Sequence, residues 1–478
     1  MTNRTSKSLL ALSLLATVAV TAGCADDDDS TPVGTASLRV VHGSPDAPAV
    51  DVYAKGSSTP LLRAVAYGAA TDYITVPAGD YVIELRAAGT PASSAAAHTT
   101  GTLSLAADAR VTAIAVGLLG STDPASQLRV LPMLEQWGPD AAGKVRVRIV
   151  HASADAPTVA IDVGNDGSAE VPALARFADT GAAGIELPAA QALQVGIWAG
   201  SPLARVTAFT TPALPDGAEL FVIATGRLAA KPRVTDGFAL LAVAPTAAVG
   251  FIKQNPVVYA LHASPDAPAV DIFAGAGELT DNLAFAQLGG AIQVPPGSYT
   301  LDLFAHAAGA TRPAGAPAFS YPTPALAAGE RYLAVATGFL SPAAGEQGFR
   351  IEAFAERFGS DPGALVRVIH ASPDAPTVDI GGVVAGTYAA VSALSGLAFP
   401  AASADAGVAL PAGPLTIGVA PAGSTTTVAR FGLTMPAGRG LFAAAVGALS
   451  PASDEQSFRL VVIDTSAAPW SATAVSPQ

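Results

Sequence analysis

One short pattern with three chemically active side chains occurs four times in the 478-residue chain. Each copy has a histidine, a serine two residues later and an aspartate two residues after that. The copies are His42-Ser44-Asp46, His151-Ser153-Asp155, His262-Ser264-Asp266 and His370-Ser372-Asp374. These are the residue types of a hydrolase triad, in which a serine oxygen attacks and a histidine takes its proton. One hypothesis is therefore hydrolysis within a single motif, for example by Ser264, His262 and Asp266.

The spacing of the three residues argues against that chemistry. Residues two apart on a strand lie about 6.6 Å apart along it, whereas a nucleophile must come within about 3 Å of its base. The sequence also has no G-x-S-x-G elbow of the kind that presents the serine in many hydrolases. We therefore predict that the chain is not an enzyme and that the motif holds no catalytic residue.

A metal centre is the second alternative. His370, Asp374 and Asp379 offer one nitrogen and two carboxylates, a set of ligands that zinc accepts. The second copy has Ala160 at the position of Asp379, and no second histidine is close to any motif in the sequence. The two remaining histidines, His98 and His306, are expected to be isolated in loops or at strand ends. We therefore expect no metal ligands and no cofactor.

A structural role is the third alternative, and the one we favour. His42 has the same parity as Leu38 and Val40, so on a strand it faces the core, while Arg39 faces solvent. The other three copies repeat this alternation. The prolines after the histidine end the strand, and the serine and aspartate can bind backbone groups where the ladder stops. The motif is then the corner of a domain.

The spacing of the motif predicts the domain organisation. Consecutive motif histidines are separated by 109, 111 and 108 residues. A period of about 110 residues suits one small domain and is too long for a solenoid unit. We expect a signal peptide at 1–23, a tether at 24–36, repeats at 37–137, 145–245, 256–358 and 364–464, and a flexible tail at 465–478. The short linkers suggest semi-flexibly joined beads.

Each repeat reads as a series of short strands. A proline-rich turn such as Val76-Pro77-Ala78-Gly79 precedes an alternating apolar segment, and a later apolar strand contains a single glycine. A glycine at such a position suggests a bulge or a close backbone approach. About seven strands in some 100 residues, with no helical periodicity, predict an all-β chain of four immunoglobulin-like antiparallel β-sandwiches. A small closed barrel is the alternative.

The N-terminus reads as a targeting segment. Arg4 and Lys7 precede the apolar stretch 9–20, and Cys24 follows small residues and is the only cysteine. The segment resembles the lipobox of bacterial lipoproteins, which implies that Cys24 is acylated and inserted into a lipid bilayer. Ala25 after the cysteine favours the outer membrane. Four consecutive aspartates, 26–29, extend the tether by repulsion.

The motif also carries a family resemblance. The stretches from His262 to Asp271 and from His370 to Asp379 resemble the hallmark of domain-of-unknown-function family 4397, whose tandem copies occur in bacterial envelope and secreted proteins. The first and second copies depart from it at Gly43 and Ala154. The resemblance implies β-sandwich domains in the cell envelope, and it brings no established activity.

These observations favour a membrane-anchored envelope lipoprotein that serves as a non-catalytic binding or adhesion array. Its partners would be the bilayer, through Cys24, and an envelope or surface protein or glycan. The net charge of −13 and the lack of basic runs argue against nucleic acid. The alternative is a structural spacer or envelope-integrity protein without a specific ligand. A hydrolase ranks third.

Overall fold

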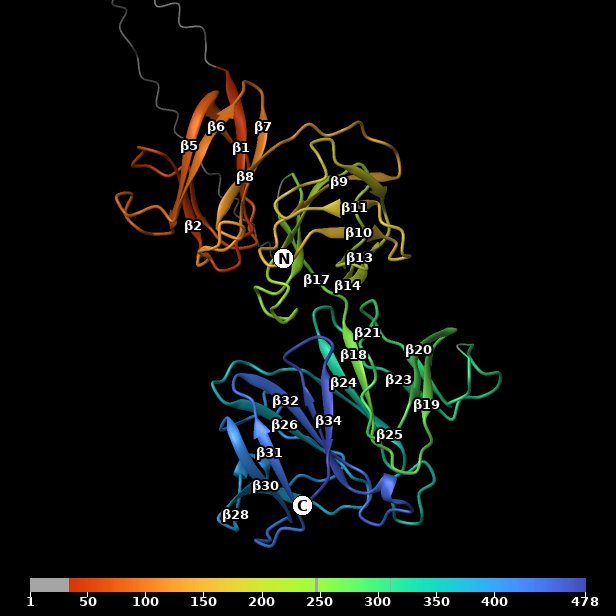
Figure 1. The fold of residues 1–478 in the computed structure, drawn as a ribbon. Coiled ribbons are helices and arrows are strands. Elements are labelled where there is room, and N and C mark those ends of the chain that lie inside the picture. The colour runs from red at the N-terminus through yellow and green to blue at the C-terminus, as the bar shows by residue number, and fades with distance from the viewer. Residues whose placement is uncertain (1–33, 246–247, 310) are drawn as a thin grey trace, which may run out of the picture.

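The structure is a computed structural model that describes residues 34–245, 248–309 and 311–478. It is all-β, and its eight sheets form four sandwich-like domains in two halves (Figure 1). Within the described residues the helical segments are two short 3-10 turns, η1 (Ser392–Leu394) and η2 (Asp454–Gln456), and no helix qualifies as a membrane span. The predicted signal peptide, Cys24 and most of the tether lie outside the described residues.

The first domain packs the sheet β4-β1-β7-β8 on the sheet β3-β2-β5-β6. Its strands are β1 (Thr35–His42), β2 (Val50–Ala54), β3 (Leu62–Val65), β4 (Ile74–Pro77), β5 (Gly79–Ala87), β6 (His98–Leu105), β7 (Arg110–Val116) and β8 (Arg129–Leu134).

The second domain repeats this arrangement with one added strand, in the sheets β12-β9-β15-β16-β17 and β11-β10-β13-β14. Its strands are β9 (Lys144–His151), β10 (Val159–Val163), β11 (Val171–Leu174), β12 (Ile185–Pro188), β13 (Gln194–Ala199), β14 (Ala204–Thr210), β15 (Glu219–Thr225), β16 (Ala239–Val243) and β17 (Ala248–Lys253).

The third domain consists of the sheets β21-β18-β24-β25 and β20-β19-β22-β23. Its strands are β18 (Val257–His262), β19 (Val270–Ala274), β20 (Gly277–Leu283), β21 (Ile292–Gln293), β22 (Thr300–Ala305), β23 (Phe319–Pro322), β24 (Arg331–Thr337) and β25 (Arg350–Ala355).

The fourth domain has the sheets β29-β26-β32-β33-β34 and β28-β27-β30-β31. Its strands are β26 (Ala364–Ala371), β27 (Val378–Val384), β28 (Thr387–Ala390), β29 (Val408–Leu410), β30 (Gly413–Pro421), β31 (Ala429–Met435), β32 (Arg439–Val446), β33 (Arg459–Asp464) and β34 (Ser471–Val475).

The prediction of all-β sandwich domains is confirmed, with one difference in topology. In every domain the strand that carries the motif histidine at or next to its end pairs in parallel with a later strand, as β1 does with β7 and β26 with β32. The other strand pairs are antiparallel, so one sheet of each domain is mixed. A parallel pair needs a long crossover. Here the crossover contains the whole second sheet, so the histidine strand lies centrally in its sheet.

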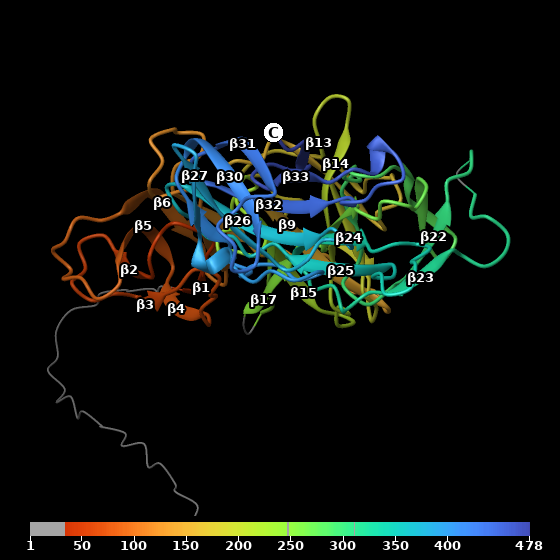
Figure 2. The same ribbon diagram turned by 90° about the horizontal axis from the view of Figure 1, so that it is seen from below.

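The outer faces of the mixed sheets are buried as well. Val41, Ile114, Phe221 and Ile223 belong to one apolar cluster shared by the first and second domains. A second cluster joins the third and fourth domains. Each half of the molecule is therefore a pair of domains packed sheet against sheet (Figure 1), and the expectation of semi-flexibly joined beads is wrong. Figure 2 shows the same ribbon from below.

The same packing corrects the expectation that Arg39 faces solvent. The side chain of Arg39 lies between the first two domains, and the residue is 1% exposed. The guanidinium donates to Thr112 Oγ1 at 2.7 Å and to the carbonyl of Ala244 in the second domain at 2.6 Å, and it lies 3.8 Å from Glu135. Arg148 is buried in the same interface and donates to the carbonyl of Leu134. Strand alternation correctly places Arg39 on the outer face of its sheet, but the second domain covers that face.

The two halves also contact each other. Lys231 of the second domain donates to Glu356 Oε1 at 2.7 Å and to the carbonyl of Phe358 at 3.0 Å, both of them at the end of the third domain. Gln293 of the third domain donates to Thr207 of the second at 3.1 Å. The stretch 246–255, which separates the predicted second and third repeats, contains β17, which pairs with β16 and so extends the second domain.

The expectation of a flexible tail at 465–478 is also wrong. Residues 471–475 form β34, which pairs with β33 along its whole length. Trp470 is 5% exposed and stacks on Tyr259 of the third domain, with ring centroids 4.1 Å apart. The many small residues of this segment suggested fraying, but one large aromatic side chain and a free sheet edge hold it in place.

Candidate functional site

The motif histidine is bonded in the same way in all four domains. Each imidazole lies at the end of a core-facing row and is at most 2% exposed. Its Nε2 lies 3.0, 2.8, 3.0 and 3.0 Å from the carbonyl oxygens of Pro48, Pro157, Pro268 and Pro376 in the four copies. Since a carbonyl only accepts, Nε2 must carry the proton. The ring therefore closes the turn between the first two strands of the domain.

The motif serine reaches across the domain to a later loop. Its Oγ donates to the carbonyl of a glycine just after the parallel strand, at 2.7, 2.8, 2.6 and 2.6 Å in the four copies. These glycines, Gly117, Gly226, Gly338 and Gly447, have φ between 83° and 88°. A Cβ at Gly117 would also lie 2.3 Å from the carbonyl oxygen of Gln127. The expected close backbone approach is therefore present, and only glycine fits it.

The motif aspartate holds the same loop. Asp46 accepts the N–H groups of Leu119 at 2.8 Å and Gly120 at 2.9 Å. Asp155, Asp266 and Asp374 each accept two successive N–H groups at the equivalent turn. The motif thus ties the first strand of each domain to a loop more than 70 residues later.

This geometry does not assemble a triad. Each serine proton points to a backbone carbonyl, and each histidine uses Nε2 for another carbonyl, so the described contacts include no bond from serine Oγ to a histidine nitrogen. Ser44 Oγ does approach Asp46 at 3.3 Å, but that carboxylate is already bonded to two backbone N–H groups. The hydrogen-bonding groups of the three side chains are therefore used to hold the backbone in place.

Burial also sets the charge of the four histidines. It lowers the pKa of His42, His151, His262 and His370, and the bond to the proline carbonyl opposes this only in part. The imidazoles are therefore neutral at neutral pH. A neutral ring with a protonated Nε2 matches the carbonyl that it faces.

A second aspartate fixes the opposite sheet. Asp51, Asp271 and Asp379 each accept backbone N–H groups from two segments that are separated in the sequence. The second copy has Ala160 at the aligned position, but Asp162, two residues on and on the same face, accepts the N–H groups of Asp166 and Gly167. Alignment of the repeats position by position therefore missed this carboxylate. Strand parity could have found it, because Asp162 lies on the same face as Ala160.

The metal alternative built on His370, Asp374 and Asp379 is not assembled. Asp374 binds the loop at Leu449, and Asp379 binds the N–H groups of Gly396 and Gly423. Within the described residues, the one group with metal-ligand spacing is Asp271, Asp281 and His306, in the third domain.

That group makes His306 less isolated than expected. His306 Nδ1 lies 2.8 Å from Asp271 Oδ1 and 3.3 Å from Asp281 Oδ1. The hydrogen bond to Asp271 is the largest of the effects that raise the pKa of His306. Both oxygens of Asp271 already accept backbone N–H groups, so a hydrogen-bonded ion pair accounts for the arrangement without a metal.

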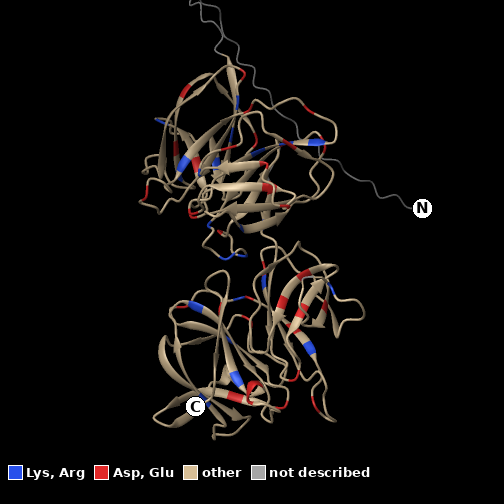
Figure 3. Ribbon diagram, turned by 45° about the vertical axis from the view of Figure 1, so that its right-hand side comes forward, with Lys and Arg blue, Asp and Glu red and all other residues tan. Residues whose placement is uncertain are grey.

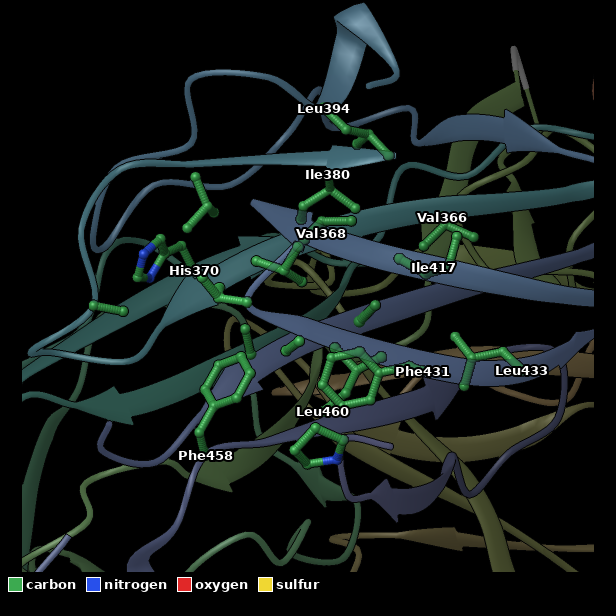
Figure 4. Close-up of a pocket in the computed structure, with 18 of the residues that line it drawn as sticks. Val366, Val368, His370, Ile380, Leu394, Ile417, Phe431, Leu433, Phe458 and Leu460 are labelled. Carbon is green, nitrogen blue, oxygen red and sulfur yellow. The ribbon is translucent and has the colours of Figure 1, made fainter. Parts of the chain in front are cut away.

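The fourth domain contains a feature that the motif did not signal. Its two sheets enclose an apolar cavity of about 230 Å³ (Figure 4), whereas the cavities inside the second and third domains have about 50 and 30 Å³. His370 is the only polar side chain among its lining residues. In Figure 4 His370 lies at one end, and Val366 and Leu433 lie toward the other. Sequence reasoning missed it because a cavity depends on packing between strands.

The fold and the corner define a class: tandem β-sandwich domains, each closed by a buried His-x-Ser-x-Asp corner. The chain belongs to the DUF4397 family, described as a domain of unknown function, whose model matches residues 36–162, 256–356 and 364–476. The second repeat is matched only at its first strands, which fits its departures from the motif.

Other comparisons add little. No curated protein matches the chain. Among solved structures, it is similar to the Bacillus anthracis TIE protein, at 10% identity over 86% of this chain and 68% of that one, with a TM-score of 0.14.

Proposed function

We propose that this chain is a non-catalytic envelope lipoprotein, anchored through acylated Cys24, that binds an envelope or surface protein or glycan. The observation that carries the non-catalytic part is the corner: in all four copies the histidine, serine and aspartate are bonded to backbone groups. Charged residues are sparse and both signs are scattered along the ribbon (Figure 3), so the proposal includes no nucleic-acid partner.

A repeated surface feature supports binding over a purely passive role. Directly after each corner glycine lies a turn whose leucine is exposed in three domains: Leu119 is 37% exposed, Leu340 is 38% and Leu449 is 49%. Thr225 Oγ1 donates to the carbonyl of Gly43, and Thr337 Oγ1 to that of Ala371, so the corners of paired domains meet at one end. Weak apolar contacts presented together would act multivalently.

The alternative is a structural spacer without a ligand. The domain pairing and the contacts of Lys231 favour it, because they make the chain stiff. A pull-down of purified envelope fractions by the full chain separates the two functions. Binding that falls when Leu119 and Leu340 are changed together to serine supports the array; neither residue lines the cavity of the fourth domain. No binding, together with rescue of a deletion phenotype by unrelated domains of equal length, supports the spacer.

The anchor is tested separately. Labelled palmitate should enter the wild-type chain and not the Cys24→Ser variant, which should leave the membrane fraction. Equal labelling of both would contradict the lipoprotein proposal.

A further inference from the structure

The fourth domain carries two adjoining hollows. The inner one is the apolar cavity of about 230 Å³, and the second is a more open groove of about 710 Å³. Five residues line both: Ile380, Leu394, Leu410, Ile417 and Leu433. Because they share walls, we treat them as one site.

The site is long and narrow. On β30 the lining residues run from Pro414 in the groove to Pro421 in the cavity. At about 3.3 Å per residue, that stretch covers on the order of 20 Å. The inner part lies between two packed sheets, whose backbones stand about 10 Å apart, so its width is that of one layer of side chains. A slim, extended molecule fits such a space better than a bulky one.

The chemistry of the lining selects an apolar ligand. The cavity walls are aliphatic or aromatic apart from His370, and burial lowers the pKa of that histidine so that the ring is neutral. A charged group inside would have no counter-charge and would lose its hydration. The groove is more polar, because Thr416 and Thr434 line it and it is open to solvent.

The site also opens to the surface through apolar side chains. Val384, in the groove, is 77% exposed, and Val428, at the cavity's other end, is 66% exposed. Exposed aliphatic residues at an opening offer a first contact for a hydrocarbon.

We propose that the fourth domain binds a single aliphatic chain of a lipid, such as a fatty acid, with the hydrocarbon in the cavity and the polar head in the groove beside Thr416 and Thr434. This goes beyond the proposed envelope binding, which relies on surface turns. The length, the narrowness and the apolar lining of the site favour a hydrocarbon chain over other ligands.

The test uses the full chain with Cys24→Ser, so that no acyl group of its own competes. The probe is cis-parinaric acid, a fluorescent fatty acid, displaced by palmitate. We expect saturable binding of one probe per chain. Ala443→Leu fills the cavity and Gly382→Leu fills the groove, and each should weaken binding about tenfold or more. Gly382 has an ordinary φ and open space around an added Cβ, so its variant should fold.

The matched control is Gly101→Leu, on β6 of the first domain. Gly101 also has open space and an ordinary φ, and neither hollow includes it. It should bind like wild type. Circular dichroism and thermal melts establish folding, and palmitate should raise the melting temperature of wild type but not of Ala443→Leu. No saturable binding by wild type, or unchanged affinity in folded Ala443→Leu and Gly382→Leu, overturns the proposal. The envelope pull-down has a different readout, so either proposal can fail alone.

Discussion

The two faces of the motif strand are organised differently. On the core side, His42, His151, His262 and His370 make the same bond to a proline carbonyl in every domain. On the outer side, three residues before each histidine, the chain has Arg39, Arg148, Tyr259 and Arg367. The corner fixes the backbone within one domain, so the same residues recur in every domain. The outer face packs against a neighbouring domain, so its residues vary with that neighbour.

The two domain pairs show how much the outer face varies. Between the first and second domains, the guanidiniums of Arg39 and Arg148 each lie 5.7 Å from the ring centroid of Phe221. Between the third and fourth, Tyr259 and Trp470 stack instead. A polar network and an aromatic stack therefore fill equivalent places. Changes at the outer face are therefore expected to uncouple domains, and changes at the corner are expected to weaken one domain.

The largest effect is expected for Phe221→Ala. Phe221 is fully buried between the first two domains and contacts Trp137 with ring centroids 5.2 Å apart. Removing such a ring typically costs about 3–5 kcal/mol. Urea unfolding of the full chain should show an earlier first transition. The exposed Leu203, changed to alanine, is the control and should leave the curve unchanged. An unaltered curve for Phe221→Ala would show that the interface contributes nothing.

A smaller effect is expected for His262→Ala, at the corner. The substitution removes the hydrogen bond to the carbonyl of Pro268 and the packing of an imidazole that is 1% exposed, which costs about 1–3 kcal/mol. Thermal melts should show destabilisation of the third domain, whereas His98→Ala, at a partly exposed histidine, should change little. If His262→Ala melts like wild type, the corner is not structural.

Asp266→Ala should cost less, about 1 kcal/mol. The carboxylate accepts the N–H groups of Leu340 and Ser341 on an exposed turn, and water can replace it there. Hydrogen exchange should increase at those two amides and not at Leu119 and Gly120, which the first copy holds. Uniform exchange at both turns would contradict the assignment.

The smallest effect expected is a dependence of stability on pH, to which the histidines of all four corners contribute. Burial holds the pKa of the corner histidines below the ordinary value of 6.5, so the unfolded chain binds protons first as the pH falls. The stability they contribute is present above about pH 6.5 and is lost as the pH drops toward their folded pKa values. His306 has the opposite sign, since its pKa is raised. Its contribution is present below about pH 6.5 and is lost as the pH rises through the folded pKa.

Urea midpoints measured across this range give the sign. They should fall on acidification, and His306→Gln should make the fall steeper. A midpoint that rises on acidification would show that the corner histidines are not buried in neutral form.

The sequence predicted what repeats within a domain. Strand alternation placed His42 toward the core, and the glycine at Gly117 predicted a close backbone approach. It could not predict that Arg39 is buried, because alternation identifies two faces and does not say whether a second domain covers one of them. The prediction of a flexible tail was wrong because the burial of Trp470 depends on Tyr259, 211 residues earlier. The cavity lies beyond pattern reasoning for the same reason.

The position of Trp470 has a consequence for biosynthesis. A chain grows from its N-terminus, and domains fold as they emerge. The first pair of domains has all of its strands once residue 253 has been made, but Tyr259 of the third domain lacks its stacking partner until Trp470 has been made. During that interval an aromatic sheet face is open to other chains. A chain that stops before Trp470 is therefore expected to expose Tyr259 and to associate with other chains, although it lacks only a short segment.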